Sequence, residues 1–292
     1  MAILVLAILS ACSSTGSTDP TTPEPAGAVE PAEPIVALAS SDLAVGPNRF
    51  AFGVLDSRAT PVRTASATAT FVYLEGESQE VREQAPARFI EWETGRAGVY
   101  VINVSFDRSG RWGLIVEVAD EEGDLIVANT GFEVAESSFS PGIGDVVPKS
   151  ANKTLWDTDD LSEITSSNEP DSELYGMTIS EATESGMPTV ITFATPAFCQ
   201  TAMCGPQVDV VAALKDRYKA RANFIHVEVY DNPKEMRGDF STGRLSPLME
   251  EWGLATEPWT FVLDREGRVA SKFEAFVTEK ELEAALQATL GS

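Results

Sequence analysis

The chain has 292 residues, of which 45 are acidic and 21 are basic, giving a net charge of −24. This charge argues against a nucleic-acid partner, because phosphate binding needs a basic face. The hydrophobic fraction of 43% is ordinary, so the chain can form a sizeable core in about one to three domains.

The first residues indicate where the protein works. Residues 2–9 form an apolar run of about the length of a signal-peptide core, too short to span a bilayer. The run leads into Leu9-Ser10-Ala11-Cys12, which resembles the lipobox of bacterial lipoproteins. The resemblance implies cleavage before Cys12, lipid on this cysteine, and a protein anchored on the extracytoplasmic side of the cell membrane. No Lys or Arg precedes the run, which departs from that family, and the alternative is a buried N-terminal strand.

The next segment is low in complexity. Residues 12–34 consist mainly of Ser, Thr, Pro, Glu and Ala without apolar periodicity, so they predict a disordered tether after a signal peptide of residues 1–11. With Cys12 lipidated, Cys199 and Cys204 remain as one potential pair in a compartment where disulfides persist.

Residues 35–135 alternate between apolar and polar side chains with a period of two. The runs 100–106 and 112–118, separated by a polar turn, predict antiparallel strands with one buried face. Roughly seven such strands in about a hundred residues predict an immunoglobulin-like β-sandwich, a resemblance of pattern that implies no activity. The unit contains no cysteine or histidine, so we interpret it as a spacer or partner-binding module.

The remainder divides into a connector and an α/β unit. Residues 136–173 are rich in Gly, Pro, Ser and Asp, although Trp156, Leu161 and Ile164 indicate that this connector lies against a domain. In residues 174–292 the pattern alternates between helix and strand and then gives a hairpin and a closing helix. It predicts strands at 189–193, 223–230, 259–263 and 268–273, and helices at 179–185, 208–218, 245–252 and 282–290. This order predicts a mixed sheet with helices on both faces.

The α/β unit resembles the thioredoxin superfamily over about residues 174–290. The resemblance depends on TVITFATPAFC followed by CGP, on NFIHVEVYDNP and on WGLATEPWTFVLDREGRV. It implies a thioredoxin-like fold and disulfide exchange through Cys199 and Cys204 without a cofactor or metal. It also implies a cis Glu257–Pro258 peptide that faces the cysteines. The implied partners are a protein thiol or disulfide substrate and a membrane redox partner.

The spacing of the cysteines departs from that family, which places two residues between them instead of four. Residues five apart on a regular helix rise by about 7.5 Å and point in different directions, whereas a disulfide needs Cα atoms within about 7 Å. We therefore expect Cys199 in the loop and Cys204 near the start of the helix. The lengths of the flanking elements favour Cys199 as the attacking thiol. Pro206, a good first helical residue, instead places Cys204 nearest the helix N-terminus, where a thiolate is stabilised.

A second departure lies beneath the cysteines. Many thioredoxins carry a buried Asp and a Lys where this chain has Thr192 and His226. One interpretation is that His226, oriented by Glu228, accepts the proton of the resolving cysteine. The other is that it is a strand histidine hydrogen-bonded in the core.

Two other classes of function stay open. Copper-binding SCO-type proteins share the implied fold, and Cys199, Cys204 and His226 are suitable ligands for a soft metal, with Met203 nearby. The cysteine spacing and the position of the histidine depart from that pattern. The other alternative is a non-catalytic surface lipoprotein in which the disulfide only staples a loop.

Overall fold

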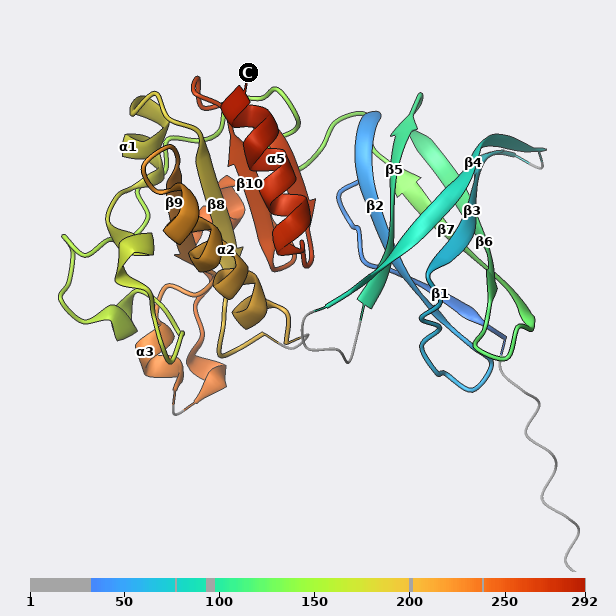
Figure 1. The fold of residues 1–292 in the computed structure, drawn as a ribbon, viewed down its shortest axis with the longest axis horizontal. Coiled ribbons are helices and arrows are strands. Elements are labelled where there is room, and N and C mark those ends of the chain that lie inside the picture. The colour runs from blue at the N-terminus through green and yellow to red at the C-terminus, as the bar shows by residue number, and fades with distance from the viewer. Residues whose placement is uncertain (1–32, 77, 93–97, 200–201, 238, 292) are drawn as a thin grey trace, which may run out of the picture. The chain divides into compact units, whose positions relative to one another are not determined.

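The computed structural model describes residues 33–76, 78–92, 98–199, 202–237 and 239–291 (Figure 1). The predicted signal peptide, Cys12 and nearly all of the predicted tether lie outside these residues. Across the described ranges, no helix is both long and apolar enough to cross a membrane.

The N-terminal unit is all-β, as its alternating pattern predicted. Its strands are β1 (Ile35–Leu38), β2 (Gly46–Leu55), β3 (Ser66–Glu75), β4 (Ser78–Glu91), β5 (Gly98–Phe106), β6 (Gly110–Ala119) and β7 (Leu125–Val134). They pair antiparallel in the order β1-β2-β5-β4-β3-β6-β7. Just after β7, Ala135 exchanges backbone hydrogen bonds of 2.9 and 3.0 Å with Leu43 and Val45, which lie between β1 and β2. The two edges of the sheet are thereby joined.

This connectivity differs from the predicted two-sheet sandwich, because all seven strands belong to one sheet. The 14-residue strand β4 pairs with β3 along most of its length and with β5 only over Arg88–Glu91. A long strand that changes partner carries the hydrogen bonding around a bend without breaking the sheet. A period of two identifies the buried face but does not say whether the strands divide into two sheets. The resemblance to immunoglobulin domains stays a prediction.

The inward-facing side chains of the β unit form a core of aromatic rings. The ring of Phe50 lies 5.1 Å from those of Phe71 and Phe132 and 6.4 Å from that of Phe106. The edge of Trp112 packs on Phe106 at 4.9 Å. Phe50 is fully buried, so its ring contributes to this core over its whole surface.

We expect Phe50→Ala to lower the free energy of unfolding of the β unit by about 3–5 kcal/mol, because it leaves a cavity among four rings. Denaturant unfolding followed by tryptophan fluorescence measures this change. The matched control is Leu125→Ala, at an exposed strand position, which should cost less than about 1 kcal/mol. An equal loss for the two variants would contradict this account of the core.

The C-terminal unit is a mixed α/β sheet, as predicted. Its main elements are α1 (Ile179–Glu184), β8 (Thr189–Ala194), α2 (Cys204–Tyr218), β9 (Asn223–Glu228), α3 (Pro233–Met236), α4 (Pro247–Glu251), β10 (Trp259–Leu263), β11 (Val269–Glu274) and α5 (Glu279–Gly291). The strand order is β11-β10-β8-β9, in which β8 and β9 are parallel and the other pairs are antiparallel. Figure 1 shows α2 and α5 lying together on the sheet.

Helices cover both faces of this sheet because successive strand residues point in opposite directions. Val190 and Phe224 pack in one core with the buried side chains of α2 and α5. Ile191 and Ile225 pack in a second core with residues of α1 and α4. Every residue of β8 is therefore buried, and the end of this central strand holds the start of the cysteine loop.

The connector lies against the α/β unit, which confirms the prediction made from its apolar residues. Gly144 donates a 2.8 Å hydrogen bond to the Val269 carbonyl on β11, and Ile164 is buried in the α2 core. Leu161 packs on the same core. Trp156 does not take part in this packing, because 86% of it is exposed.

Candidate active site

The loop between β8 and α2 folds back so that both cysteines reach the same place. The amide of Cys199 donates to the Thr195 carbonyl at 3.1 Å, which turns the chain directly after β8. Ala202 has a left-handed backbone (φ +56°), and its amide donates to the Cys199 carbonyl at 3.3 Å. Helix α2 then begins at Cys204. This confirms the prediction that Cys199 lies in the loop and Cys204 at the start of the helix.

The two cysteines are thiols with different surroundings. Cys199 is partly exposed, whereas Cys204 is fully buried. A hydrogen bond with Cys199, followed by burial, raises the pKa of Cys204 well above its usual value. This shift opposes the stabilisation that a helix N-terminus gives a thiolate, so Cys204 keeps its proton while Cys199 faces solvent. The geometry therefore favours Cys199 as the attacking sulfur.

A carboxylate stands beside the thiols. The Sγ atoms of Cys199 and Cys204 and a carboxylate oxygen of Glu257 all lie within 4.8 Å of one another. Burial, followed by the charges of Cys199 and Glu228, raises the pKa of Glu257. Glu257 was absent from the predicted site, although it precedes the proline that the thioredoxin resemblance placed opposite the cysteines.

The peptide bond between Glu257 and Pro258 is cis, which confirms that part of the prediction. Pro258 leads into β10, the strand next to β8, and its carbonyl accepts a 3.0 Å hydrogen bond from the amide of Ala275. Because a carboxylate oxygen of Glu257 lies within 4.8 Å of both sulfurs, the start of β10 lies beside the cysteine loop.

His226 makes different contacts from those that a proton acceptor for Cys204 would need. The Tyr175 hydroxyl lies 2.7 Å from Nδ1, and the Ala194 carbonyl lies 3.0 Å from Nε2. Because a carbonyl only accepts, Nε2 carries the proton and Nδ1 accepts from Tyr175. Both nitrogens are therefore engaged, which favours the interpretation of His226 as a core histidine. Burial lowers its pKa to about 4, against the opposing effect of the hydrogen bond to Ala194.

Glu228 also has a different role from the one expected. Its carboxylate accepts hydrogen bonds from the backbone amides of Ser166 at 2.8 Å and Val229 at 3.0 Å, and no hydrogen bond to His226 is observed between these two described residues. Ser166 belongs to the connector, and its hydroxyl accepts a 3.1 Å hydrogen bond from the amide of Ala197 in the cysteine loop. Glu228 therefore anchors the connector against the loop.

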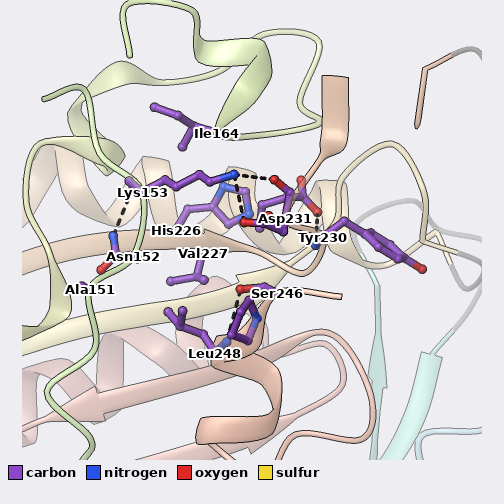
Figure 2. Close-up of a pocket in the computed structure, with 12 residues that line it drawn as sticks. Ala151, Asn152, Lys153, Ile164, His226, Val227, Tyr230, Asp231, Ser246 and Leu248 are labelled. Atoms are coloured by element: carbon purple, nitrogen blue, oxygen red, sulfur yellow. Dashed lines mark hydrogen bonds and ion pairs between the residues drawn. The ribbon is translucent and has the colours of Figure 1, made fainter. Parts of the chain in front are cut away.

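His226 lines a cavity of about 180 Å³ at the edge of the sheet, between β9 and the connector (Figure 2). Lys153 reaches across this cavity to Asp231, with its Nζ atom 2.9 Å from Oδ1. Neither Cys199 nor Cys204 lines the cavity, so it is separate from the thiol site.

An aromatic wall of Phe198, Tyr230 and Phe240 stands next to Cys199. The Phe198 ring packs edge-on against Tyr230 at 6.2 Å and against Phe240 at 5.3 Å. Phe240 is 68% exposed. Burial, followed by the charge of Glu257, raises the pKa of Tyr230. The wall offers apolar surface to any chain segment that approaches Cys199.

The ligand set suggested for copper is not assembled, because both ring nitrogens of His226 are engaged elsewhere. A second acidic group, consisting of Asp171, Glu173 and Asp216, surrounds the Lys215 ammonium at 2.6–2.9 Å. The Lys215 ammonium therefore already pairs with these three carboxylates, at the position that a metal ion would take. Among the described residues, the converging donors next to the cysteine loop are Cys199, Cys204 and Glu257.

Comparison with known proteins gives only distant similarity. No protein-family model and no curated protein matches the chain. Among solved structures, a putative thiol:disulfide interchange protein DsbE from Chlorobium tepidum is 18% identical, with a TM-score of 0.38 over 52% of this chain and 100% of that one. A thioredoxin family protein from Chlorobium tepidum TLS is 16% identical, with a TM-score of 0.33 over 41% and 90% of the two chains. A DsbF homologue from Corynebacterium diphtheriae is 17% identical, with a TM-score of 0.31 over 38% and 76%. Similarity at this level does not establish a family or an activity, so the function has to be inferred from the geometry of the thiols.

We expect iodoacetamide to modify Cys199 at least about tenfold faster than Cys204 in the reduced protein, because the thiolate is the reactive species and Cys204 is buried and protonated. Peptide mass spectrometry after timed quenching measures the two rates. In Cys199→Ser, Cys204 should stay slow in the folded protein and become reactive on denaturation. Faster labelling of Cys204 would reverse the assignment.

His226 is the only histidine of the chain, so NMR reports its protonation without assignment. We expect a titration midpoint near 4 and no change of the imidazole signals around pH 6.5. The unfolded chain binds this proton below about pH 6.5, so the free energy of unfolding should fall as the pH drops from there toward 4. A midpoint near 6.5 would contradict the buried neutral state.

Proposed function

We propose that this protein is a thiol–disulfide oxidoreductase that acts through Cys199 and Cys204. The observation that carries the proposal is the pairing of a partly exposed thiol with a buried thiol at the start of a helix, the two sulfurs lying within 4.8 Å of one another. A structural staple needs no such asymmetry. Disulfide exchange needs one sulfur that is accessible to attack the substrate and a second sulfur that reacts only after a mixed disulfide has formed.

In the proposed reaction, the Cys199 thiolate attacks one sulfur of a substrate disulfide, and the other substrate sulfur leaves as a thiolate. Cys204 then loses its proton and attacks the Cys199 sulfur of the mixed disulfide. The second substrate thiolate departs, and two electrons have passed from the protein to the substrate. A carboxylate oxygen of Glu257 lies within 4.8 Å of the Cys204 sulfur, and its raised pKa suits Glu257 to take up the proton.

The surroundings of the thiols favour the reducing direction. The carboxylate of Glu257 lies within 4.8 Å of both sulfurs, in a site whose reduced state carries a thiolate. Repulsion destabilises that thiolate relative to the uncharged disulfide, and a disulfide that is relatively stable belongs to a reductant. The proposed substrate is a protein disulfide whose flanking apolar residue rests on Phe198 and Phe240.

We also propose that the protein works on the extracytoplasmic side of a cell membrane, held by lipid on Cys12 and re-reduced by a membrane partner. Support comes from the apolar run and the Leu9-Ser10-Ala11-Cys12 motif in the sequence. A redox-active pair in that oxidising compartment requires a dedicated source of electrons.

A trapping experiment tests the exchange reaction. Cys204→Ser incubated with a peptide disulfide should accumulate a mixed disulfide at Cys199, because the resolving sulfur is missing. The control Cys199→Ser should trap little, and the wild type should release reduced peptide. Mass spectrometry under non-reducing conditions measures all three. No adduct in either variant, together with a reduction potential below about −300 mV, would instead support a structural disulfide.

A further inference from the structure

The reduced site brings together three donor atoms that suit one metal ion. The sulfurs of Cys199 and Cys204 and a carboxylate oxygen of Glu257 lie within 4.8 Å of one another. In a tetrahedral zinc site, Zn–S bonds of about 2.3 Å and Zn–O bonds of about 2.1 Å place neighbouring donors about 3.6–3.8 Å apart. Closing the present arrangement onto an ion requires movements of roughly an ångström or less per donor atom.

We propose that the reduced protein binds Zn²⁺ through Cys199, Cys204 and Glu257, with the fourth position open to water. Cys199 is partly exposed, so the ion can enter from the solvent side of the loop. Each thiol that is still protonated releases its proton on binding, because the thiolate is the ligand. Formation of the Cys199–Cys204 disulfide removes both thiolates, so the oxidised protein should not hold the ion.

The donor set favours zinc over copper(I). Copper(I) is soft and is satisfied by thiolate or thioether sulfur, whereas zinc accepts sulfur and carboxylate oxygen together. His226, the nitrogen donor suggested by the sequence for copper, is engaged with Tyr175 and Ala194. Glu257 is therefore the residue that distinguishes a zinc site from an ordinary dithiol.

The charges near the site also favour a dication. Glu257 is half-buried next to two sulfurs that become negative on ionisation, and Glu228 lies buried nearby with its negative field on the same carboxylate. These like charges repel one another in surroundings that screen them poorly. A bound dication offsets this repulsion, and among the described residues no positively charged side chain forms an ion pair with Glu257.

Anaerobic titration of the full reduced chain with Zn²⁺ against a chromophoric chelator tests the proposal. We expect one equivalent to bind, and no tight binding to the oxidised protein or to Cys199→Ser and Cys204→Ser. The nearly isosteric Glu257→Gln should weaken binding at least about tenfold, since it removes one of three protein ligands. The matched control Glu266→Gln, at an exposed turn, should bind like the wild type. Circular dichroism of each reduced variant confirms its fold.

Reduced wild type that binds no zinc, or a folded Glu257→Gln variant with unchanged affinity, would overturn the proposal. Its outcome is separable from that of the exchange reaction, because zinc binding needs only the dithiol state. Zinc binding without mixed-disulfide trapping would leave a metal site in a protein without exchange activity. Trapping without zinc binding would leave an oxidoreductase in which Glu257 takes up the Cys204 proton but binds no metal.

Discussion

The candidate site depends on the approach of two sulfur atoms, because the Sγ atoms of Cys199 and Cys204 lie within 4.8 Å of one another. Six residues of chain from one cysteine to the other would separate the sulfurs if they continued as a helix. The left-handed backbone of Ala202 and the hydrogen bond from its amide to the Cys199 carbonyl turn the chain, so that the two sulfurs approach one another. Once they meet, the burial of one and the exposure of the other create the chemical difference between an attacking and a resolving thiol.

Side chains of several elements hold the cysteine loop, which keeps Cys199 exposed and Cys204 buried. His226 on β9 donates to the carbonyl of Ala194 at the end of β8, and Tyr175 donates to His226. Glu228 holds Ser166, whose hydroxyl meets the loop at Ala197. These side chains act on the backbone around the site instead of on the sulfurs. A mobile loop would lose the alignment on which disulfide exchange depends, because a small displacement of reacting atoms slows a reaction strongly.

The acidic character of the chain continues into the site. A carboxylate oxygen of Glu257 lies within 4.8 Å of both sulfurs, and the charge of the buried Glu228 raises the pKa of Glu257. Negative charge near the sulfurs destabilises a thiolate, which is consistent with a reductant. It also favours the binding of a cation over that of an anion. The same carboxylate therefore underlies two proposals, one about the proton of Cys204 and one about zinc.

From the amino-acid sequence alone followed the all-β and α/β character of the two units and the placement of Cys199 in a loop and Cys204 at a helix start. The cis bond before Pro258 was implied only by the resemblance to thioredoxins. The features that followed from the residues themselves depend on short-range patterns, namely a period of two in the strands and helix-start residues. Only the tertiary structure decided that the seven N-terminal strands form one sheet, that His226 bonds to Tyr175 and Ala194, and that Glu257 joins the thiols. The contacts of His226 and Glu257 join residues more than 30 positions apart, and the single sheet depends on β4 changing its partner from β3 to β5. A linear pattern carries no information on which side chains meet, or on which strands pair, once the chain has folded.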